Sequence, residues 1–162
     1  MKKRFRPLAF TVCGLLVSVS LFCQNPDPNT IAKSHWLVGT WKGIYNGKPF
    51  YETWRKNNDN SLICFSLQIA NGDTTVRKNS EIKMLNDEIV FADPKIFKAK
   101  RMMDNEMVFE INDNIGQSRI IWLHTNEDHW WVILQYPKVT ANYDLVRVPA
   151  LDRAISRHLP KQ

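Results

Sequence analysis

Apolar and polar residues alternate in short segments along most of this chain, and a turn signal ends each segment. The segments are rich in Val, Ile, Phe, Trp, Tyr and Thr, which favour strands. Pairs such as Asn46-Gly47 and Asn86-Asp87 separate them and suit the positive φ angles of tight hairpins. About ten such segments lie near residues 37–45, 49–55, 61–70, 75–85, 88–92, 96–102, 106–112, 117–125, 129–136 and 142–148. None of them keeps a helical period over ten residues, so the pattern predicts an all-β chain.

The connections between these segments are short, which favours an antiparallel meander. Closing the meander into an up-and-down barrel would hide its two edge strands. A β-sandwich is the structural alternative, but a Greek key needs long crossovers that this sequence does not offer. The sequence therefore predicts one antiparallel β-barrel of about ten strands over residues 36–149.

A short helix is expected after the last strand. Pro149 should end that strand, since proline cannot donate to the ladder of a sheet. Apolar residues then recur at four-residue spacing, at Leu151, Ile155 and Leu159. Residues 150–162 are expected to form a short helix and tail that pack outside the barrel or fray.

The first 23 residues are typical of a signal peptide. Four basic residues precede an uncharged, mostly apolar run over residues 8–22, which is too short for a comfortable transmembrane span. An uncleaved membrane anchor is the alternative. No later segment is apolar for long enough to cross a bilayer. We expect an exported protein, periplasmic or extracellular, in which residues 24–35 form an extended leader ending in one helical turn.

The cleavage site leaves two possibilities for Cys23. Cleavage after Cys23 would give an ordinary secreted protein. The stretch Ser20-Leu21-Phe22-Cys23 also resembles a lipoprotein box, which would place a lipid anchor on Cys23. Phe22 is bulkier than that box prefers, so ordinary secretion is favoured.

Removing the signal changes the charge and cysteine content. The chain has 22 Lys and Arg and 16 Asp and Glu, and four of the basic residues lie in the signal, so 18 basic residues remain against 16 acidic ones. This near balance gives no argument for a nucleic-acid partner. Cys64 is the one cysteine beyond Cys23, which excludes an intrachain disulfide in the mature chain. We expect a monomer held by its core, with Cys64 as a small buried hydrophobe.

The inward face of the predicted barrel supplies the candidate ligand site. Alternate residues of a strand share a face, so aromatic and aliphatic side chains from several strands could line an apolar cup. The candidate ligand-binding residues are Glu52, Trp54, Phe65, Phe109, Trp122 and Tyr136. The alternative is a lumen filled by these side chains, as in small barrels, although ten strands usually enclose more room than eight.

Glu52 is the most distinctive of these candidates, because it is a carboxylate between the aromatic residues Phe50 and Trp54 on one strand face. If Glu52 faces inward, its pKa should rise, and it could hold the polar end of a ligand or act as a base. The alternative is a solvated Glu on the outer face, or one paired with an Arg.

Metal and catalytic signatures are weak. His124 and His129 flank a turn and could bind zinc together with Glu127 or Asp128, but two-His sites on exposed turns are usually incidental. A haem site on one His has still less support. The sequence contains no Ser-His-Asp order, Gly-rich phosphate loop or Cys-His cluster. We expect no catalytic residue, no metal and no cofactor.

Three motifs carry a resemblance to a known group of proteins. These are Trp36-Leu37-Val38-Gly39-Thr40-Trp41, Tyr51-Glu52-Thr53-Trp54 and, late in the chain, Tyr143-Asp144-Leu145-Val146-Arg147. The pattern resembles lipocalin-like (calycin) secreted bacterial families of unknown function and is more distantly similar to lipocalins and fatty-acid-binding proteins. Most lipocalins carry an additional long helix and often a disulfide, and this sequence has neither.

The resemblance implies structural roles for three residues. It places Arg147 on the closing strand against the indole of Trp41 on the first strand. Gly39 would allow a close approach of the chain at a barrel bend, and Trp41 would fill the base of the barrel.

The function that the sequence favours is binding of a small apolar or amphipathic molecule by an exported barrel. Two alternatives stay open. One is a structural or protein-interaction barrel with a filled lumen, and the other is an enzyme that uses Glu52 as a cavity carboxylate. Fold alone does not decide among them.

Overall fold

The computed structural model describes residues 28–57, 59–70, 73–155 and 159. The predicted signal peptide, the possible lipid anchor at Cys23 and residues 24–27 of the expected leader lie outside the described residues. In the part that is described, neither helix is long and apolar enough to cross a membrane.

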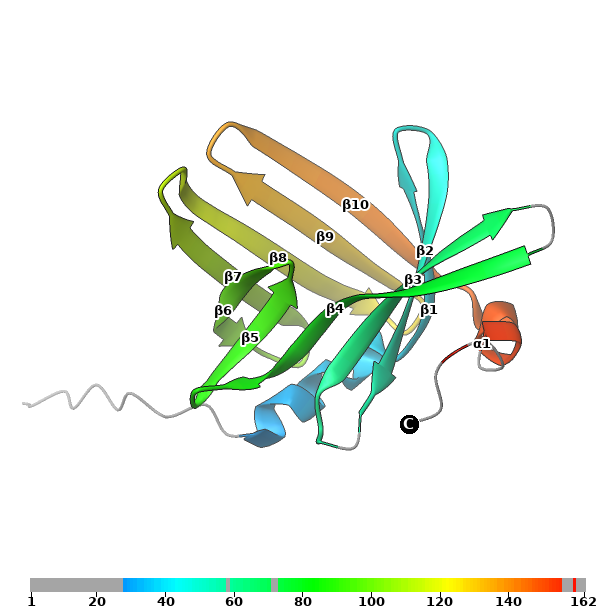
Figure 1. Cartoon of the computed structure of the whole chain (residues 1–162), viewed down its shortest axis with the longest axis horizontal. Coiled ribbons are helices and arrows are strands. Elements are labelled where there is room, and N and C mark those ends of the chain that lie inside the picture. The colour runs from blue at the N-terminus through cyan, green and yellow to red at the C-terminus, as the bar shows by residue number, and fades with distance from the viewer. Residues whose placement is uncertain (1–27, 58, 71–72, 156–158, 160–162) are drawn as a thin grey trace, which may run out of the picture.

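Ten antiparallel strands form a closed barrel in simple up-and-down order (Figure 1). The strands are β1 Gly39–Tyr45, β2 Lys48–Lys56, β3 Leu62–Ala70, β4 Asp73–Leu85, β5 Glu88–Asp93, β6 Lys95–Met102, β7 Glu106–Asp113, β8 Gly116–Asn126, β9 His129–Tyr136 and β10 Val139–Arg147. Strand β1 pairs with β2 on one side and with β10 on the other, where Trp41 lies opposite Arg147. The predicted ten-stranded barrel is confirmed, and the β-sandwich alternative is wrong.

Tight turns of Asn, Asp and Gly make this topology possible. Asn46 and Gly47 both take positive φ angles in the β1–β2 hairpin, and Asn86 and Asp87 do the same in the β4–β5 hairpin. Two-residue turns of this kind match the right-handed twist of the flanking strands. Each strand therefore returns directly beside its predecessor, as the turn signals predict.

A 3-10 helix, η1 (Pro28–Leu37), covers one end of the barrel, which we call the closed end (Figure 1). Its residues Ile31, Ser34 and Leu37 are buried, and the Ser34 hydroxyl lies 3.0 Å from the Met107 sulfur of β7. The sequence predicted one helical turn within a leader separate from the barrel. The helix is longer, and its buried residues Ile31 and Leu37 belong to the barrel core, so the helix is not separate from the barrel.

The closed end is fastened by a contact between the first and last strands. The Trp41 side chain is fully buried, and its indole N–H donates to the Leu37 carbonyl at 2.7 Å. The Arg147 guanidinium lies 5.7 Å from the Trp41 ring centroid and donates to the Val38 carbonyl at 3.2 Å. This confirms the predicted placement of Arg147 against Trp41.

Gly39 is required by the same contact. It has a φ of 134°, and a Cβ at this position would lie 2.9 Å from the Arg147 guanidinium. Glycine is therefore needed both for its backbone conformation and for the close approach of the Arg147 side chain.

The C-terminal helix α1 (Pro149–Ile155) lies outside the barrel, as expected (Figure 1). Pro149 is its first residue, a position where a missing N–H costs nothing. Ile155 and the following Leu159 are buried against Phe65 and Leu67 on the outer face of β3.

The predicted inward direction of Phe65 is wrong for this reason. Leu62 and Cys64 face the core of the barrel, so the alternate residues Phe65 and Leu67 face outward. The sequence analysis took the bulkier set as the inward one. The apolar outer stripe of β3 is explained by the cover that α1 provides.

Candidate ligand-binding cavity

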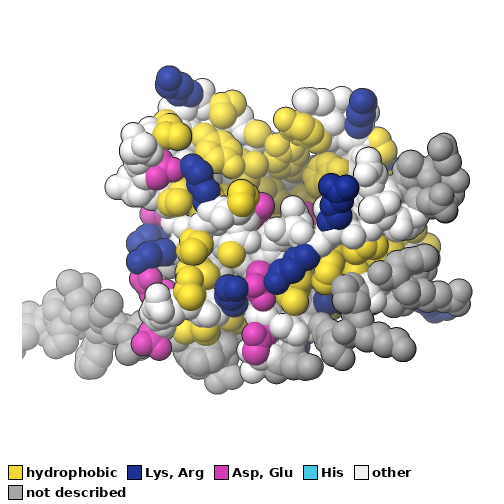
Figure 2. All heavy atoms as spheres, in the orientation of Figure 1, with side chains coloured by type: hydrophobic (Ala, Val, Ile, Leu, Met, Phe, Trp, Pro, Cys, Tyr) yellow, Lys and Arg dark blue, Asp and Glu magenta, His cyan; other side chains and the backbone are white. Residues whose placement is uncertain are grey.

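The barrel encloses a cavity of about 530 Å³ that opens opposite η1. We call this the open end, formed by the β1–β2, β5–β6, β7–β8 and β9–β10 hairpins. Figure 2 shows a hollow at the top of the molecule with hydrophobic side chains on both sides. The lining residues are Tyr45, Phe50, Glu52, Trp54, Asn79, Ser80, Phe91, Asp93, Pro94, Lys95, Phe97, Ser118, Ile120, Trp122, Trp130, Val132, Leu134, Tyr136, Tyr143 and Leu145.

Aromatic rings that contact one another edge to face form the inner walls. Trp122 of β8 lies at the centre, with ring centroids 5.4 Å from Trp54, 5.0 Å from Phe91 and 5.4 Å from Trp130. Such contacts favour fixed ring orientations. The walls are therefore held in place by their own packing and need no bound molecule to form them.

Gly43 makes room for one further ring. A Cβ on Gly43 would lie 2.3 Å from the ring of Phe50, the residue opposite it on β2. Phe50 in turn contacts Tyr143 edge to face, with ring centroids 5.9 Å apart. The absent side chain at position 43 thus allows Phe50 to line the cavity.

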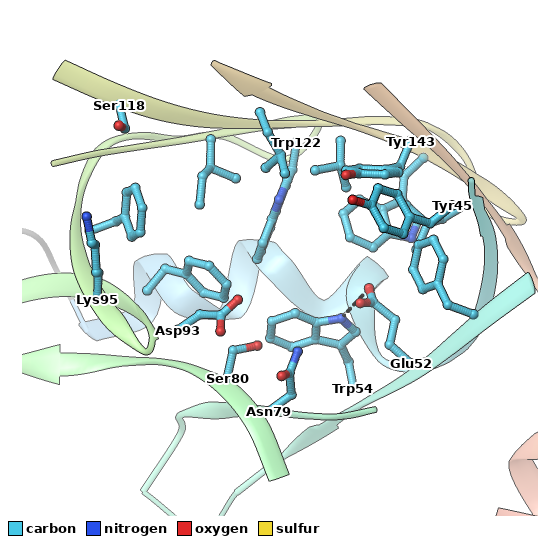
Figure 3. Close-up of a pocket in the computed structure, with 18 of the residues that line it drawn as sticks. Tyr45, Glu52, Trp54, Asn79, Ser80, Asp93, Lys95, Ser118, Trp122 and Tyr143 are labelled. Atoms are coloured by element: carbon cyan, nitrogen blue, oxygen red, sulfur yellow. Dashed lines mark hydrogen bonds between the residues drawn. The ribbon is translucent and has the colours of Figure 1, made fainter. Parts of the chain in front are cut away.

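Glu52 lies on the cavity wall beside Trp54 (Figure 3). The Trp54 indole N–H donates to Glu52 Oε1 at 3.0 Å, and the Cys64 sulfur lies 3.9 Å from Oε2. Burial raises the pKa of Glu52 from 4.5 to about 7, against the opposing effect of the Trp54 hydrogen bond, and the charge of Asp93 adds to the rise. Glu52 can therefore exchange a proton near neutral pH.

Asp93, the last residue of β5, is the second carboxyl group in the cavity. Burial raises its pKa. Among the described residues, no hydrogen-bond donor or cation contacts its carboxylate. In the described part of the lining Lys95 is the one basic residue, and its ammonium group lies 2.7 Å from Asp113 at the rim. In Figure 3 the Lys95 side chain points away from Asp93.

A β-bulge brings two small polar residues to the same wall. Cys64 pairs with Ser80 and Phe65 pairs with Lys78, so Asn79 of β4 is the extra residue. Asn79 and Ser80 consequently both border the cavity, although they are neighbours in sequence and would face opposite sides of a regular strand.

Cys64 is free and fully buried, as expected of a small core residue. Burial, with a further contribution from the charge of Glu52, raises its pKa well above the usual value. The thiol is therefore protonated at neutral pH and is poorly suited to act as a nucleophile. The proton-transfer chemistry of the cavity rests with Glu52 and Asp93.

Four of the six predicted site residues border the cavity: Glu52, Trp54, Trp122 and Tyr136. Phe109 faces inward but lies in the packed core, where its ring contacts Phe91 and Trp122 at 5.6 and 5.3 Å and is fully buried. Phe65, as described above, lies outside the barrel.

The sequence analysis missed the polar residues near the mouth. Asp93 precedes Pro94 between the predicted strand segments 88–92 and 96–102, a position that indicates only a turn. Tyr143 was assigned to the closing-strand motif, and Asn79 lies in a stretch of polar residues with no alternation that would reveal its face. The one available signal was the position of Asp93 and Tyr143 near strand ends on the same side of the meander.

The zinc hypothesis for His124 and His129 is wrong in its geometry. The bulge near Thr125 places His124 opposite Trp130, and His129 lies opposite Asn126. His124 stacks on Trp36 with ring centroids 4.8 Å apart, and His129 pairs with Asp144. Over the described residues, no group of three potential ligands could hold a metal ion.

Comparison of the whole sequence with protein-family models found no match, and comparison with curated proteins found none at a significant level.

Proposed function

We propose that this protein binds a small, largely apolar molecule with one polar end in the barrel cavity. The observation that carries the proposal is a cavity of about 530 Å³ with aromatic walls and a carboxyl group, that of Glu52, on one side. Small-molecule sites commonly have volumes of 300–1,000 Å³ and a few polar groups among apolar walls.

Two further features support binding over a purely structural barrel. The rings of Trp54, Trp122 and Trp130 are fixed by one another, so a ligand would meet a surface that is already formed. Tyr45 and Tyr136 are exposed at the rim, next to the opening through which a ligand could enter. The export expected from residues 1–23 would place this binding in the periplasm or outside the cell.

Two measurements test the proposal. Native mass spectrometry of the purified protein should reveal any molecule retained in the cavity. Isothermal titration calorimetry with 1-naphthalenemethanol, a two-ring alcohol, should detect binding to the emptied protein.

Trp54→Ala should weaken binding of this alcohol roughly tenfold or more, because it removes an aromatic wall of the cavity. Trp131→Ala is the matched control, since Trp131 is a strand tryptophan on β9 that is 43% exposed and absent from the described cavity lining. Equal losses in both variants, or no binding and no retained molecule in the unsubstituted protein, would overturn the proposal.

A further inference from the structure

The charges that face the cavity are unbalanced, and this bears on the class of ligand that the proposed binding function would serve. Glu52 and Asp93 both border the cavity, and each lacks a cationic partner among the described residues. Lys95 is the only basic residue among the described residues of the lining, and its ammonium group forms a 2.7 Å ion pair with Asp113 at the rim. Among the described lining residues, a molecule in the cavity therefore meets two carboxyl groups without a cationic partner and one lysine that is paired with Asp113.

The hydrogen-bonding capacity of the two carboxyl groups is largely unused. Glu52 accepts one hydrogen bond at Oε1, from Trp54, while Oε2 has only the weak thiol donor of Cys64 at 3.9 Å. The Asp93 carboxylate has no donor at all within the described part of the chain. An ionised carboxylate can accept several hydrogen bonds, and both of these groups are partly shielded from water, so they leave acceptor capacity for the donors of a ligand.

Aromatic faces surround the space between these groups. Figure 3 shows Glu52 beside the indole N–H of Trp54 and Asp93 on the other side of the same ring, with both carboxyl groups directed into the cavity. Trp122 stands edge to face with Trp54 at 5.4 Å. Indole faces attract organic cations through the ring quadrupole, and more strongly where water is excluded.

We propose that the ligand class of this cavity is an organic cation, namely a protonated amine carried on an apolar body of aromatic size. The ammonium group would donate a hydrogen bond to Glu52, beside the Trp54 indole, and the charge of Asp93, which acts on the Glu52 carboxyl, would add to the attraction. The apolar body would lie against the rings of Trp54 and Trp122. An anionic amphiphile such as a fatty acid would bring a third negative charge into the same space and is disfavoured. This inference depends on the proposed binding function.

Three probes that share one ring system separate the possibilities. They are 1-naphthalenemethylamine, which is cationic at neutral pH, 1-naphthalenemethanol, which is neutral, and 1-naphthoate, which is anionic. Calorimetric titration of the full protein should give an affinity for the amine roughly tenfold or more above that for the alcohol, as expected for charge-assisted hydrogen bonds. The naphthoate should bind most weakly.

Each other outcome has a definite meaning. If the alcohol or the naphthoate binds as tightly as the amine, the cavity binds small molecules but the cation inference is wrong. If none of the three binds, and native mass spectrometry finds no retained molecule, both the inference and the proposed function are wrong.

Isosteric variants identify the groups that are responsible. Glu52→Gln and Asp93→Asn should each lower the amine-to-alcohol affinity ratio roughly three- to tenfold, while alcohol binding reports that the cavity is still folded. Asp104→Asn is the matched control, because Asp104 is an exposed acid on the β6–β7 turn away from the cavity lining. An unchanged ratio in both cavity variants, or an equal fall in the control, would contradict the inference.

Discussion

The closed end and the open end of the barrel are both rich in aromatic residues, but the packing of those residues differs. At the closed end, Trp41 is fully buried, 5.9 Å from Trp130 in ring centroids, and is covered by Arg147 and η1. At the open end, Tyr45 is 55% exposed and contacts Tyr143 at 5.8 Å in a loose, tilted pair. One end is a packed plug and the other is a rim around an opening.

The polar groups divide less sharply, because among the described residues the ring nitrogens Trp36 Nε1, His124 Nε2 and Trp130 Nε1 are buried at the closed end without a hydrogen-bond partner. The Trp41 N–H at the closed end is paired with a backbone carbonyl, whereas Asp93 near the open end has no hydrogen-bond or ionic partner in the described part of the chain. A paired buried N–H stabilises the fold, whereas a partly buried carboxylate without a protein partner leaves hydrogen-bonding capacity that a ligand can use. The comparison suggests that stability is concentrated at the closed end and recognition at the open end.

The largest effect should follow from damage to the plug. Trp41→Ala should lower the free energy of unfolding by about 3–5 kcal/mol, because it removes a fully buried indole and leaves a cavity. Tyr45→Ala, at the rim, should change it by no more than about 0.5 kcal/mol. Urea denaturation followed by circular dichroism measures both. Similar losses in the two variants would refute the division between the ends.

Glu52→Gln should stabilise the protein at alkaline pH. The pKa of Glu52 is about 7 in the folded protein and 4.5 in the unfolded chain, so the folded state holds the proton more tightly. Its contribution to stability is complete below pH 4.5 and is lost as the pH rises through 7. Above pH 7 the ionised carboxylate lowers the free energy of unfolding by about 3 kcal/mol, and the neutral amide of glutamine causes no such loss.

Denaturation of both proteins between pH 4 and pH 8.5 tests this. The stabilisation by Gln should grow between pH 4.5 and pH 7, level off above pH 7 and vanish near pH 4. A constant difference over the whole range would mean that Glu52 is not perturbed. If the same variant also binds the amine more weakly, Glu52 lowers the stability of the fold at alkaline pH and strengthens ligand binding.

A smaller effect is expected at the strand closure. Arg147→Lys should cost about 0.5–2 kcal/mol, because lysine loses the planar contact with the Trp41 ring. Ligand affinity should stay unchanged, since Arg147 is absent from the cavity lining. Thermal unfolding measures the stability of this variant, and calorimetric titration measures its ligand affinity. A loss of affinity without a loss of stability would contradict the structural role of Arg147.

The sequence predicted the closed end better than the open end, for a physical reason. Gly39, Trp41 and Arg147 act through local constraints: a backbone that requires glycine, a buried indole and a cross-strand contact fixed by register. The strand number and the meander followed from turn residues that specify φ angles. Signals of this kind are carried by single residues or pairs, so they can be read without knowledge of the fold.

The cavity depends on features that are not local. The face of β3 could not be assigned from alternation, because α1 covers an outer stripe that is as apolar as the lumen. The bulge at Asn79 changes the direction of two neighbouring side chains without any Gly or Pro to mark it. Asp93 borders the same cavity as Glu52, which lies 41 positions earlier in the chain, because closure of the barrel places β2 and β5 around one lumen.

The hydrogen bond from Trp54 to Glu52 gives the protein an optical property. Three of the six tryptophans in the chain, Trp54, Trp122 and Trp130, border the cavity, and Trp54 is joined directly to the group that gains and loses a proton near pH 7. A change of charge 3.0 Å from an indole nitrogen alters the electric field on its excited state. The ultraviolet emission of the unlabelled protein should therefore report both the protonation of Glu52 and the arrival of a ligand.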